Sequence, residues 1–441
     1  MANILLVSLG CAKNQVNSEE MLHVLTCAGH TMVEQADVAA LAVVNTCGFI
    51  DAAKEEAIEH ILSLGQHKAK GTLKRILVVG CLAQRYRDEL LAMPEVDGVL
   101  GTGSYWEIAD AVACALRGEV VSRFDNIDAP LTARERIFDA GAGWAYLKIA
   151  EGCDNDCAYC VIPSIRGKFR SRSMDSLLPE ARKLTDAGVR ELILVAQDTT
   201  RYGLDLYGKR SLPELICKLA EIPTLHWIRL HYLYPDGIDD ALIETIRDTQ
   251  KAVRYLDIPI QHISDEILTA MRRRGSGAQI RALIQKLRKA LPGLVLRTSL
   301  IAGLPGEGER EFCELAAFLQ EMKLERVGAF PYSPQENTAA AAMPNRPSED
   351  DAEQRVLRLM TIQQETMDSF NQSRLGTTDT VLCTGFDEER GQYFGRSYAE
   401  SPEVDGVIWL ESAENLAVGT FYNVCYTGQI DGELAGEIMP Y

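Results

Sequence analysis

The sequence predicts an α/β protein in three parts: a parallel-sheet domain, an open (β/α)6 partial barrel and a small antiparallel β-barrel. Two patterns support this prediction. Apolar runs alternate with helical patterns four times before residue 120 and six times from residue 144 onward, and strands that alternate with helices pair in parallel. After residue 372 short β-rich runs replace the helices. We therefore expect domains at 1–120, 144–372 and 373–441, with a linker at 121–143.

The N-terminal block contains four apolar runs of strand length, each followed by an amphipathic helical pattern. The runs are Ile4–Leu9, Leu41–Asn45, Ile76–Gly80 and Val96–Leu100. Strands joined by helices form a parallel sheet, because the helix returns the chain to the same edge. The following segment, Val121–Gly143, mixes charges with Pro130 and a Gly-Ala-Gly run, which is typical of a connector.

The central block repeats the strand and helix pattern six times. Its expected strands are Trp144–Ala150, Glu191–Ala196, His226–Leu233, Tyr255–Ile260, Val295–Ile301 and Arg326–Tyr332, and a last helix is expected over Ser348–Gln372. Six such units predict an open, incomplete version of the eight-stranded TIM barrel. The last block has short runs at Thr380–Thr384, Val407–Leu410 and Phe421–Thr427, separated by Gly, Asp and Pro. These runs predict a small antiparallel barrel.

Composition limits the class of protein. Of the 441 residues, 46% are hydrophobic and 24% charged, as in ordinary globular chains. No apolar run approaches the roughly 20 residues that span a membrane, so we expect a cytoplasmic protein. In that reducing compartment the twelve cysteines favour metal or redox use over disulfides. The net charge of −18 argues against a general nucleic-acid binder.

Three cysteines, which we call the central thiol set, follow the first strand of the central block. Cys153, Cys157 and Cys160 have C-x3-C-x2-C spacing and no fourth ligand. A closed zinc site needs four Cys or His ligands, whereas a 4Fe-4S cluster held by three cysteines keeps one iron open for a small molecule. The spacing therefore favours a catalytic cluster; a zinc loop and three unrelated core residues are the alternatives.

A second group, the N-terminal thiol set, consists of Cys11, Cys47 and Cys81, each just past a predicted strand. The carboxyl ends of parallel strands meet at one edge, where open α/β sheets form their ligand crevice. We therefore expect these thiols to converge and to hold a second cluster; small packed residues at strand ends are the alternative. The other six cysteines are expected to be buried structural thiols: Cys27, Cys114, Cys217, Cys313, Cys383 and Cys425.

Over essentially its full length the chain resembles the radical-SAM methylthiotransferase family. The resemblance is carried by the Cys153–Cys160 run with Tyr159 and by three N-terminal runs, SLGCAKNQVNS from Ser8, NTCGFI from Asn45 and VVGCL from Val78. It implies a methylthiotransferase N-terminal domain, a radical-SAM barrel and a TRAM-like C-terminal barrel. It also implies two 4Fe-4S clusters and S-adenosylmethionine (SAM), which is both radical source and methyl donor.

The resemblance also implies roles for the two thiol sets, whose six cysteines are expected to be metal ligands and catalytic. The open iron of the central set is implied to bind SAM, whose reductive cleavage yields a 5′-deoxyadenosyl radical. The N-terminal set is implied to hold the sulfur species that is transferred. Both sets must then face one cavity between the two α/β domains. A radical is needed because no protein side chain can deprotonate an unactivated C–H bond beside a carboxylate.

Polar and glycine residues at the ends of the barrel strands are expected to contact SAM. Tyr159 is expected near the adenine, and Gln197, Asp198, Gln261, Gly303 and Gly306 complete the expected cofactor-binding set. For each polar residue the alternative is a structural role at a strand end, as for His262. The basic run from Arg166 to Arg172 is either a solvated face or a contact for acidic groups.

Within the family, the runs Ala196–Gly203, His231–Asp236 and Gln261–Asp265 resemble members that methylthiolate the β-carbon of an aspartate in small-subunit ribosomal protein uS12. Residues 375–441 hold two arginines against twelve Asp and Glu, a net charge of −10. Such a domain repels RNA, so we expect no nucleic-acid binding by it, and it suits a basic ribosomal protein as partner. A sulfur donor and an electron donor are further partners, whose identity the sequence leaves open.

Two other functions remain open at this point. One is a methylthiotransferase of a tRNA adenosine, which the acidic C-terminal block disfavours. The other is a non-catalytic iron–sulfur or zinc scaffold that binds a ribosomal partner.

Overall fold

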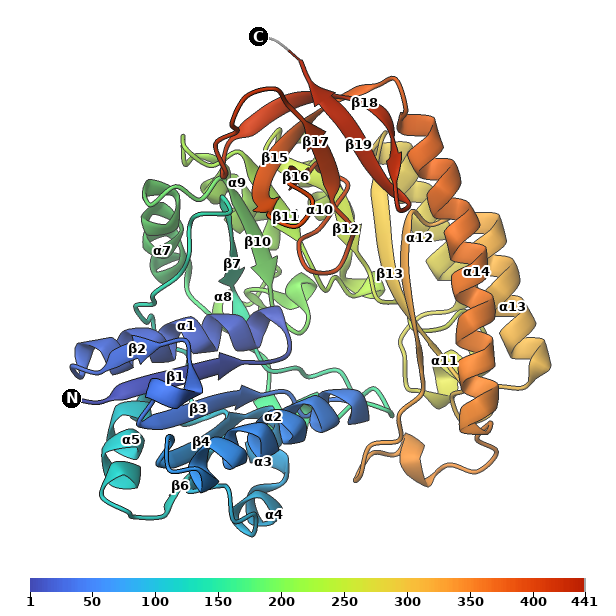
Figure 1. Ribbon diagram of the computed structural model, residues 1–441. Helices are drawn as coiled ribbons and strands as arrows, with labels where there is room; N and C mark the ends of the chain where they lie inside the picture. Colours follow the sequence, from blue (N-terminus) through green and yellow to red (C-terminus); the bar gives the residue numbers. More distant parts are fainter. Residues whose placement is uncertain (440–441) are drawn as a thin grey trace.

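A computed structural model describes residues 1–439. Pro440 and Tyr441, which end the expected C-terminal barrel, lie outside the described residues. Figure 1 shows the N-terminal sheet domain in blue, the central half-barrel in green to orange and the small barrel in red. No helix within the described range is both long and apolar enough to cross a membrane.

The N-terminal sheet is parallel with strand order β2-β1-β3-β4-β5-β6. Its apolar residues alternate between two cores: Ile76 and Val78 of β4 face one side, and Leu77 and Val79 face the other. Helices α1 and α5 cover the second side, and α2, α3 and α4 cover the first. The elements are β1 (Asn3–Ser8), α1 (Ala12–Cys27), β2 (Thr31–Val33), β3 (Leu41–Thr46), α2 (Asp51–Ala69), β4 (Arg75–Gly80), α3 (Cys81–Arg85), α4 (Arg87–Leu91), β5 (Gly98–Leu100), α5 (Ile108–Leu116) and β6 (Val121–Arg123).

Two strands of this sheet were not expected from the sequence. Both β2 and β6 are three residues long, too short for a hydrophobic period to show. Strand β6 pairs with β5 and lies within the segment expected to be a linker.

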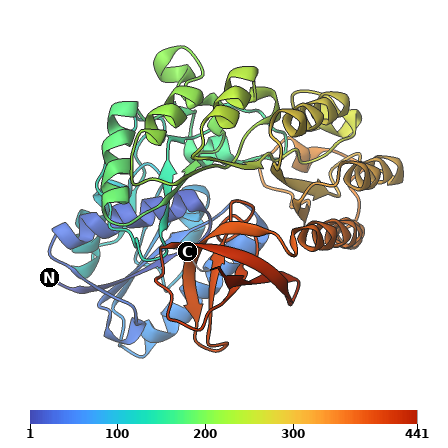
Figure 2. The ribbon, with the colours of Figure 1, turned by 90° about the horizontal axis from the view of Figure 1, so that it is seen from above.

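The six strands expected in the central domain are all present, in one parallel sheet of order β14-β13-β12-β11-β10-β7 that does not close. Each is followed by a helix on its outer face, where the largest core of the protein lies. Figure 2 shows this arc of helices outside the strands, with the N-terminal domain and the small barrel on the inner side. The strands are β7 (Trp144–Lys148), β10 (Glu191–Val195), β11 (Trp227–Leu230), β12 (Ala252–Asp257), β13 (Val295–Ala302) and β14 (Arg326–Pro331), and the helices are α7 (Met174–Asp186), α9 (Leu212–Ala220), α10 (Asp240–Asp248), α12 (Gly277–Ala290), α13 (Glu309–Met322) and α14 (Glu349–Arg374).

The C-terminal domain is a closed five-stranded barrel of order β15-β16-β17-β19-β18. Four of its pairings are antiparallel as expected, but β17 and β19 pair in parallel. The strands are β15 (Thr378–Asp387), β16 (Gln392–Arg396), β17 (Ile408–Glu411), β18 (Phe421–Ile430) and β19 (Glu433–Ile438).

Two neighbouring domains cover the inner face of the half-barrel. On one side Ala12 and Val16 of α1 pack against Tyr146, Ile193 and Val195. On the other side lies the segment 397–405, which joins β16 to β17 and which we call the plug loop. Ala399 of this loop packs with buried residues of β12 and β13. The open sheet is therefore closed by parts of the chain that lie outside its own domain.

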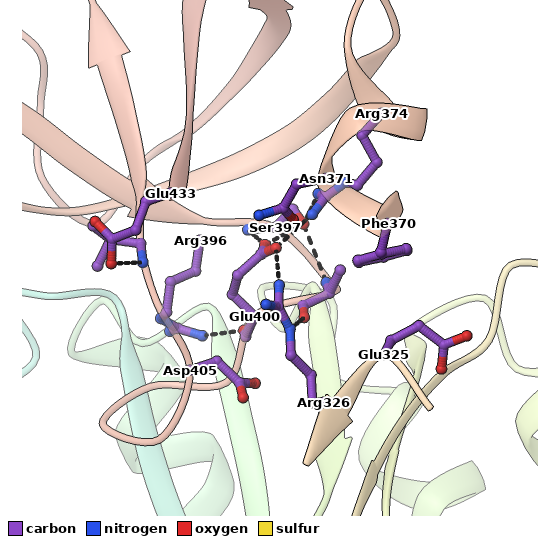
Figure 3. Close-up of polar contacts among 12 residues, drawn as sticks. Glu325, Arg326, Phe370, Asn371, Arg374, Arg396, Ser397, Glu400, Asp405 and Glu433 are labelled. Carbon is purple, nitrogen blue, oxygen red and sulfur yellow. Dashed lines mark hydrogen bonds and ion pairs between the residues drawn. The ribbon is translucent and has the colours of Figure 1, made fainter. Parts of the chain in front are cut away.

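Buried ion pairs fix the plug loop to the half-barrel (Figure 3). Glu400, which is 2% exposed, accepts hydrogen bonds from Arg374 at 2.5 Å and from Arg326 at 2.9 Å. Arg396 at the end of β16 donates to Glu191 of β10 at 2.8 Å, and Glu191 also accepts from Arg229 at 2.6 Å.

Hydrogen bonds to single strands complete the docking of the loop. Tyr255 donates its hydroxyl to Asp405 at 2.7 Å. His231 lies 2.7 Å from the hydroxyl of Ser401. Glu400 and Asp405, counted above among the acidic residues suited to a basic partner, are thus buried structural groups.

The ion pairs of Glu400 predict a pH-dependent stability of this docking. Burial raises the pKa of Glu400, but the charges of Arg374 and Arg326 outweigh it and lower the pKa to about 2. Its contribution is present above the ordinary carboxyl pKa of 4.5 and is lost as the pH falls towards 2. At pH 7, Glu400→Gln is expected to lower the free energy needed to detach the small barrel from the half-barrel by about 3 kcal/mol. At pH 3 the decrease is expected to be smaller.

Hydrogen exchange of peptides from residues 378–438 at both pH values measures this opening. Glu411→Gln, which removes an exposed carboxylate of the same barrel, is the control and is expected to change little. Equal effects of the two substitutions at pH 7 would contradict the structural role of Glu400.

Candidate cluster-binding site

The N-terminal thiol set lies at the carboxyl edge of the first sheet. Cys11 follows β1 and precedes α1, Cys47 follows β3, and Cys81 is the first residue of α3. Strands β1 and β3 are neighbours although β2 lies between them in sequence, so the chain changes direction across the sheet here and opens a crevice.

Glycines beside the thiols let these loops approach each other. Gly10 has φ +92°, and a Cβ there would lie 2.7 Å from the Cβ of Cys47. Gly80, just before Cys81, has φ +97°, and a Cβ there would lie 2.6 Å from the side-chain oxygen of Asn45. Larger residues would strain the backbone and push the thiols apart.

The three N-terminal thiols influence one another's ionisation. Burial, together with the charges of Cys81 and Cys11, raises the pKa of Cys47 to about 12. Burial likewise raises the pKa of Cys81, whereas for Cys11 the charges of Lys13 and Arg166 outweigh burial and lower the pKa. Thiols that oppose one another's ionisation need a cation to hold them as thiolates, and bound iron supplies that charge. The set therefore fits a cluster.

The central thiol set follows β8 (Ala150–Glu151) and has the same character. Burial raises the pKa of Cys160 to about 12 and that of Cys153 to about 11. Backbone amides point at two of the sulfurs: Asn155 N–H donates to Cys153 and Ile162 N–H to Cys160, each at 3.4 Å. Such N–H groups lower the energy of reduced cluster sulfurs, so this set also fits a cluster.

Side chains from two further loops contact Cys157. A guanidinium nitrogen of Arg273 lies 3.7 Å from its sulfur, and the Tyr234 hydroxyl lies 3.6 Å away. Within residues 1–439 no three Cys, His, Asp or Glu side chains are placed to ligate one metal ion. A four-iron cluster is a different case, because its three protein thiolates bind three different irons and need not converge on one point.

Arg166, at the end of α6 (Ile162–Arg166), joins the two sets. It is 3% exposed and donates to the sulfur of Cys81 at 3.1 Å and to Asn17 at 3.0 Å. It also donates to the Asn14 side chain and pairs with Glu151 at 3.4 Å. Since Glu151 stands two residues before Cys153, one guanidinium contacts Cys81 and the segment that leads into the central set.

Packing brings one residue of the N-terminal set beside the segment that carries the central set. Cys81 packs against Val161 and Ile165, which directly follow the central set. The expected convergence of both thiol sets between the two α/β domains stays a prediction that this contact supports. The basic run that begins at Arg166 is also resolved: Arg166 and Arg172 are buried contacts, while Lys168 is exposed.

The polar residues expected to bind SAM differ in how many of their hydrogen-bonding groups are already engaged within the chain. Gln197 donates to Glu151 at 2.8 Å, and its side-chain oxygen is buried without a partner. Asp198 is engaged by Asn155 at 2.9 Å and by Thr200. Gln261 has φ +70°, a strained backbone for a residue other than glycine. Gln197 is thus the best placed of these to accept a hydrogen bond from a ligand.

The remaining expected residues have structural contacts. Tyr159 is buried in an apolar group with Ile267, Met271 and Leu304. Gly303 and Gly306 have φ of +83° and +87° and form the turn before α13. His262 lies 3.4 Å from Glu307, which accepts from the Gly303 amide at 3.0 Å.

Sequence reasoning missed several residues that contact the thiols or their partners. These are Lys13, Glu151, Tyr234 and Arg273. Glu151 and Lys13 each lie two residues from a predicted cysteine ligand, and this closeness in sequence could have identified them as neighbours of the thiols. Tyr234 and Arg273 reach Cys157 from distant loops, and no local pattern identifies them.

The expectation for the other six cysteines is partly wrong. Cys114 and Cys383 are buried as expected, and Cys425 is half-buried, but Cys27, Cys217 and Cys313 are exposed. An apolar helical pattern does not fix which residues of the helix face solvent. Cys27 is the last residue of α1, and Cys313 lies on the solvent side of α13, 3.5 Å from Glu309.

Three protein-family models match successive parts of the chain. Residues 3–101 match the uncharacterized protein family UPF0004, residues 147–319 match the radical SAM superfamily, and residues 375–439 match the TRAM domain. These ranges correspond to the sheet domain, the half-barrel and the small barrel.

Whole-chain relatives are also found. The ribosomal protein uS12 methylthiotransferase RimO of Desulforamulus reducens is 45% identical over 99% of this chain and 100% of its own length. RimO of Pelotomaculum thermopropionicum is 47% identical over 98% of both chains. Among solved structures, the radical S-adenosylmethionine methyltransferase TsrM from Kitasatospora setae matches with a TM-score of 0.55 at 14% identity, covering 76% of this chain and 75% of that one. At that identity the match shows a shared fold.

The two thiol sets predict an iron content that can be divided. Two 4Fe-4S clusters correspond to about eight irons per chain. Replacing Cys153, Cys157 and Cys160 by Ala is expected to leave about four irons, measured by iron and sulfide analysis after anaerobic reconstitution. Replacing the exposed Cys27, Cys217 and Cys313 by Ala is the matched control and should leave the iron content unchanged. Equal iron in both triple variants would rule out the central site.

Proposed function

The chain belongs to the RimO family of ribosomal protein uS12 methylthiotransferases, and from this we propose that it adds a methylthio group to the β-carbon of an aspartate in uS12. The observation that carries the proposal is the buried Arg166, which donates to Cys81 of the N-terminal set and pairs with Glu151, two residues before the central set. Transfer of sulfur to a carbon radical requires the radical and the sulfur to be formed beside each other, and the two sets meet that requirement.

In this proposal the chain positions groups rather than performing acid–base chemistry. The central set and the N-terminal set each hold a 4Fe-4S cluster, and when bound the clusters and SAM supply the radical, the methyl group and the transferred sulfur. The chain contributes the six thiolates, the buried Arg166 that fixes their separation, and a wall from α1 that excludes water from the inner face of the half-barrel. Gln197, with its free oxygen, and Gln261 border the SAM site.

We assign the domains as 1–120 for sulfur, 144–372 for the radical and 373–441 for the substrate. The segment 121–143 lies between the first two, and its first residues, Val121–Arg123, add β6 to the first sheet. A ribosomal protein substrate places the enzyme in the cytoplasm. The acidic residues left exposed on the small barrel support a basic protein partner: Glu388, Glu389, Glu403, Glu411, Glu414, Asp431 and Glu437. They repel RNA phosphates, which disfavours a tRNA substrate.

The division of labour between the thiol sets is testable. Replacing Cys11, Cys47 and Cys81 by Ala is expected to abolish methylthiolated uS12, because the sulfur site is lost. The central set is untouched, so reductive formation of 5′-deoxyadenosine is expected to continue. Mass spectrometry of uS12 and chromatography of the nucleoside measure the two outcomes. Full methylthiolation by this variant would show that the N-terminal set is not the sulfur site.

The acidic surface predicts how binding of uS12 depends on salt. Glu388 and Glu389 lie on the exposed turn between β15 and β16. Reversing both to Lys is expected to weaken binding of uS12 about tenfold at low salt. The difference should shrink as the Debye length falls from about 10 Å at 0.1 M towards 3 Å at 1 M.

Reversal of Glu353 and Glu365 on the exposed side of α14 is the control, with the same change of net charge. Fluorescence anisotropy with labelled uS12 measures the affinities. If both double variants weaken binding equally, net charge and not the barrel surface attracts the substrate.

A further inference from the structure

Lys13 places a buried ammonium group beside the two thiol sets. It is the second residue of α1 and is 7% exposed. Its Nζ lies 3.4 Å from the ring centroid of Tyr232, in the loop after β11. Across residues 1–439 no ion pair joins this nitrogen to a carboxylate. Burial lowers the pKa of Lys13, but the Tyr232 side chain and the Cys11 thiolate raise it more, so these two groups are its partners.

Neighbouring cations are already paired. Arg166 and Lys148 both contact Glu151, at 3.4 and 3.1 Å. Arg274 pairs with Asp236 at 2.9 Å. Burying an ammonium costs several kcal/mol, and a desolvated cation–π contact returns about 2 kcal/mol. Lys13 has no carboxylate partner among the described residues, and a Cys11 thiolate that ligates iron shares its charge with the metal. Lys13 therefore keeps the capacity to bind a carboxylate from a substrate.

The position of Lys13 points to the substrate. Cys11 is two residues before it, and Tyr234, two residues after Tyr232, reaches Cys157 at 3.6 Å. The ammonium thus interacts with Cys11 of the N-terminal set and, through Tyr232, contacts the loop whose Tyr234 reaches the central set. Tyr232 is held there in a strained conformation with φ +58°. The Tyr232 amide donates to the Asp257 carboxylate at 3.2 Å, and the Tyr232 carbonyl accepts from the Thr199 amide at 3.1 Å.

We propose that the ammonium of Lys13 binds the side-chain carboxylate of the substrate aspartate, with the Tyr232 ring fixing its position. This inference rests on the proposed function. The carbon that reacts is bonded directly to the carboxylate carbon, so a salt bridge to Lys13 holds that carbon between the thiol sets. The same charge distinguishes an aspartate from an asparagine and from a neutral nucleobase.

A charge-exchange experiment tests the inference. Wild-type protein and the variants Lys13→Met and Lys13→Arg are given two substrates, uS12 and uS12 in which the modified aspartate is replaced by asparagine. We expect the wild type to prefer the aspartate substrate about 100-fold in kcat/KM. Lys13→Met should lose most activity on aspartate and bring the preference close to one. Lys13→Arg should retain a clear preference, because it keeps the positive charge.

Two further measurements separate substrate binding from structural effects. Binding of the two substrates in the absence of reductant should show the same change of preference as kcat/KM. Lys74→Met, which removes an exposed lysine of the same domain, should behave as wild type. Iron content of Lys13→Met should equal that of the wild type.

Each other outcome contradicts either the inference about Lys13 or the proposed function. An unchanged aspartate preference in Lys13→Met refutes the inference and leaves the proposed function intact. Loss of about half the iron from this variant would show that Lys13 serves the cluster of the N-terminal set, which also refutes it. A wild-type protein that leaves uS12 unmodified while forming 5′-deoxyadenosine refutes the proposed function itself, and the inference with it.

Discussion

The buried guanidinium of Arg166 is the interaction on which the geometry of the site depends. Its fixed planar fork reaches Cys81, Asn14 and Asn17 on one side and Glu151 on the other. Arginine keeps its charge at any physiological pH, so this joint does not loosen by deprotonation. The two sheets have separate cores, and packing of α1 on the half-barrel and of Cys81 on Val161 and Ile165 supports this joint. A chemistry that depends on two sites acting on one atom needs the distance between those sites to be constant.

Around this joint the half-barrel is completed by its neighbours. An open six-stranded sheet would leave its inner face to water, and here α1 covers one part and the plug loop covers another. The plug loop is held by charged pairs in a place where a closed barrel would have packed apolar layers. Burial of Glu191 and Arg229 is tolerated because each has a partner within 2.6 to 2.8 Å.

The sequence predicted those features that repeat or that have a strict chemical spacing. The strand and helix alternation located all six strands of the half-barrel, and the position of Cys11, Cys47 and Cys81 after strands predicted their convergence. The features that the sequence did not predict depend on contacts between residues that are distant in sequence. The burial of Glu400 requires Arg326 and Arg374, and Lys13 acquires meaning only from Tyr232. Cys217 and Cys313 were expected to be buried and are exposed, because an apolar pattern does not fix which side of a helix faces water.

The plug loop has a consequence for the modularity of the chain. The small barrel closes on itself and looks like an independent appendage at the C-terminus (Figure 1). Its loop nevertheless carries Ser401 and Asp405, the partners of His231 and Tyr255 inside the half-barrel. A chimera that exchanges the barrel between relatives must therefore exchange the strand residues that face the loop as well. The small barrel and the half-barrel are in this sense a single structural unit.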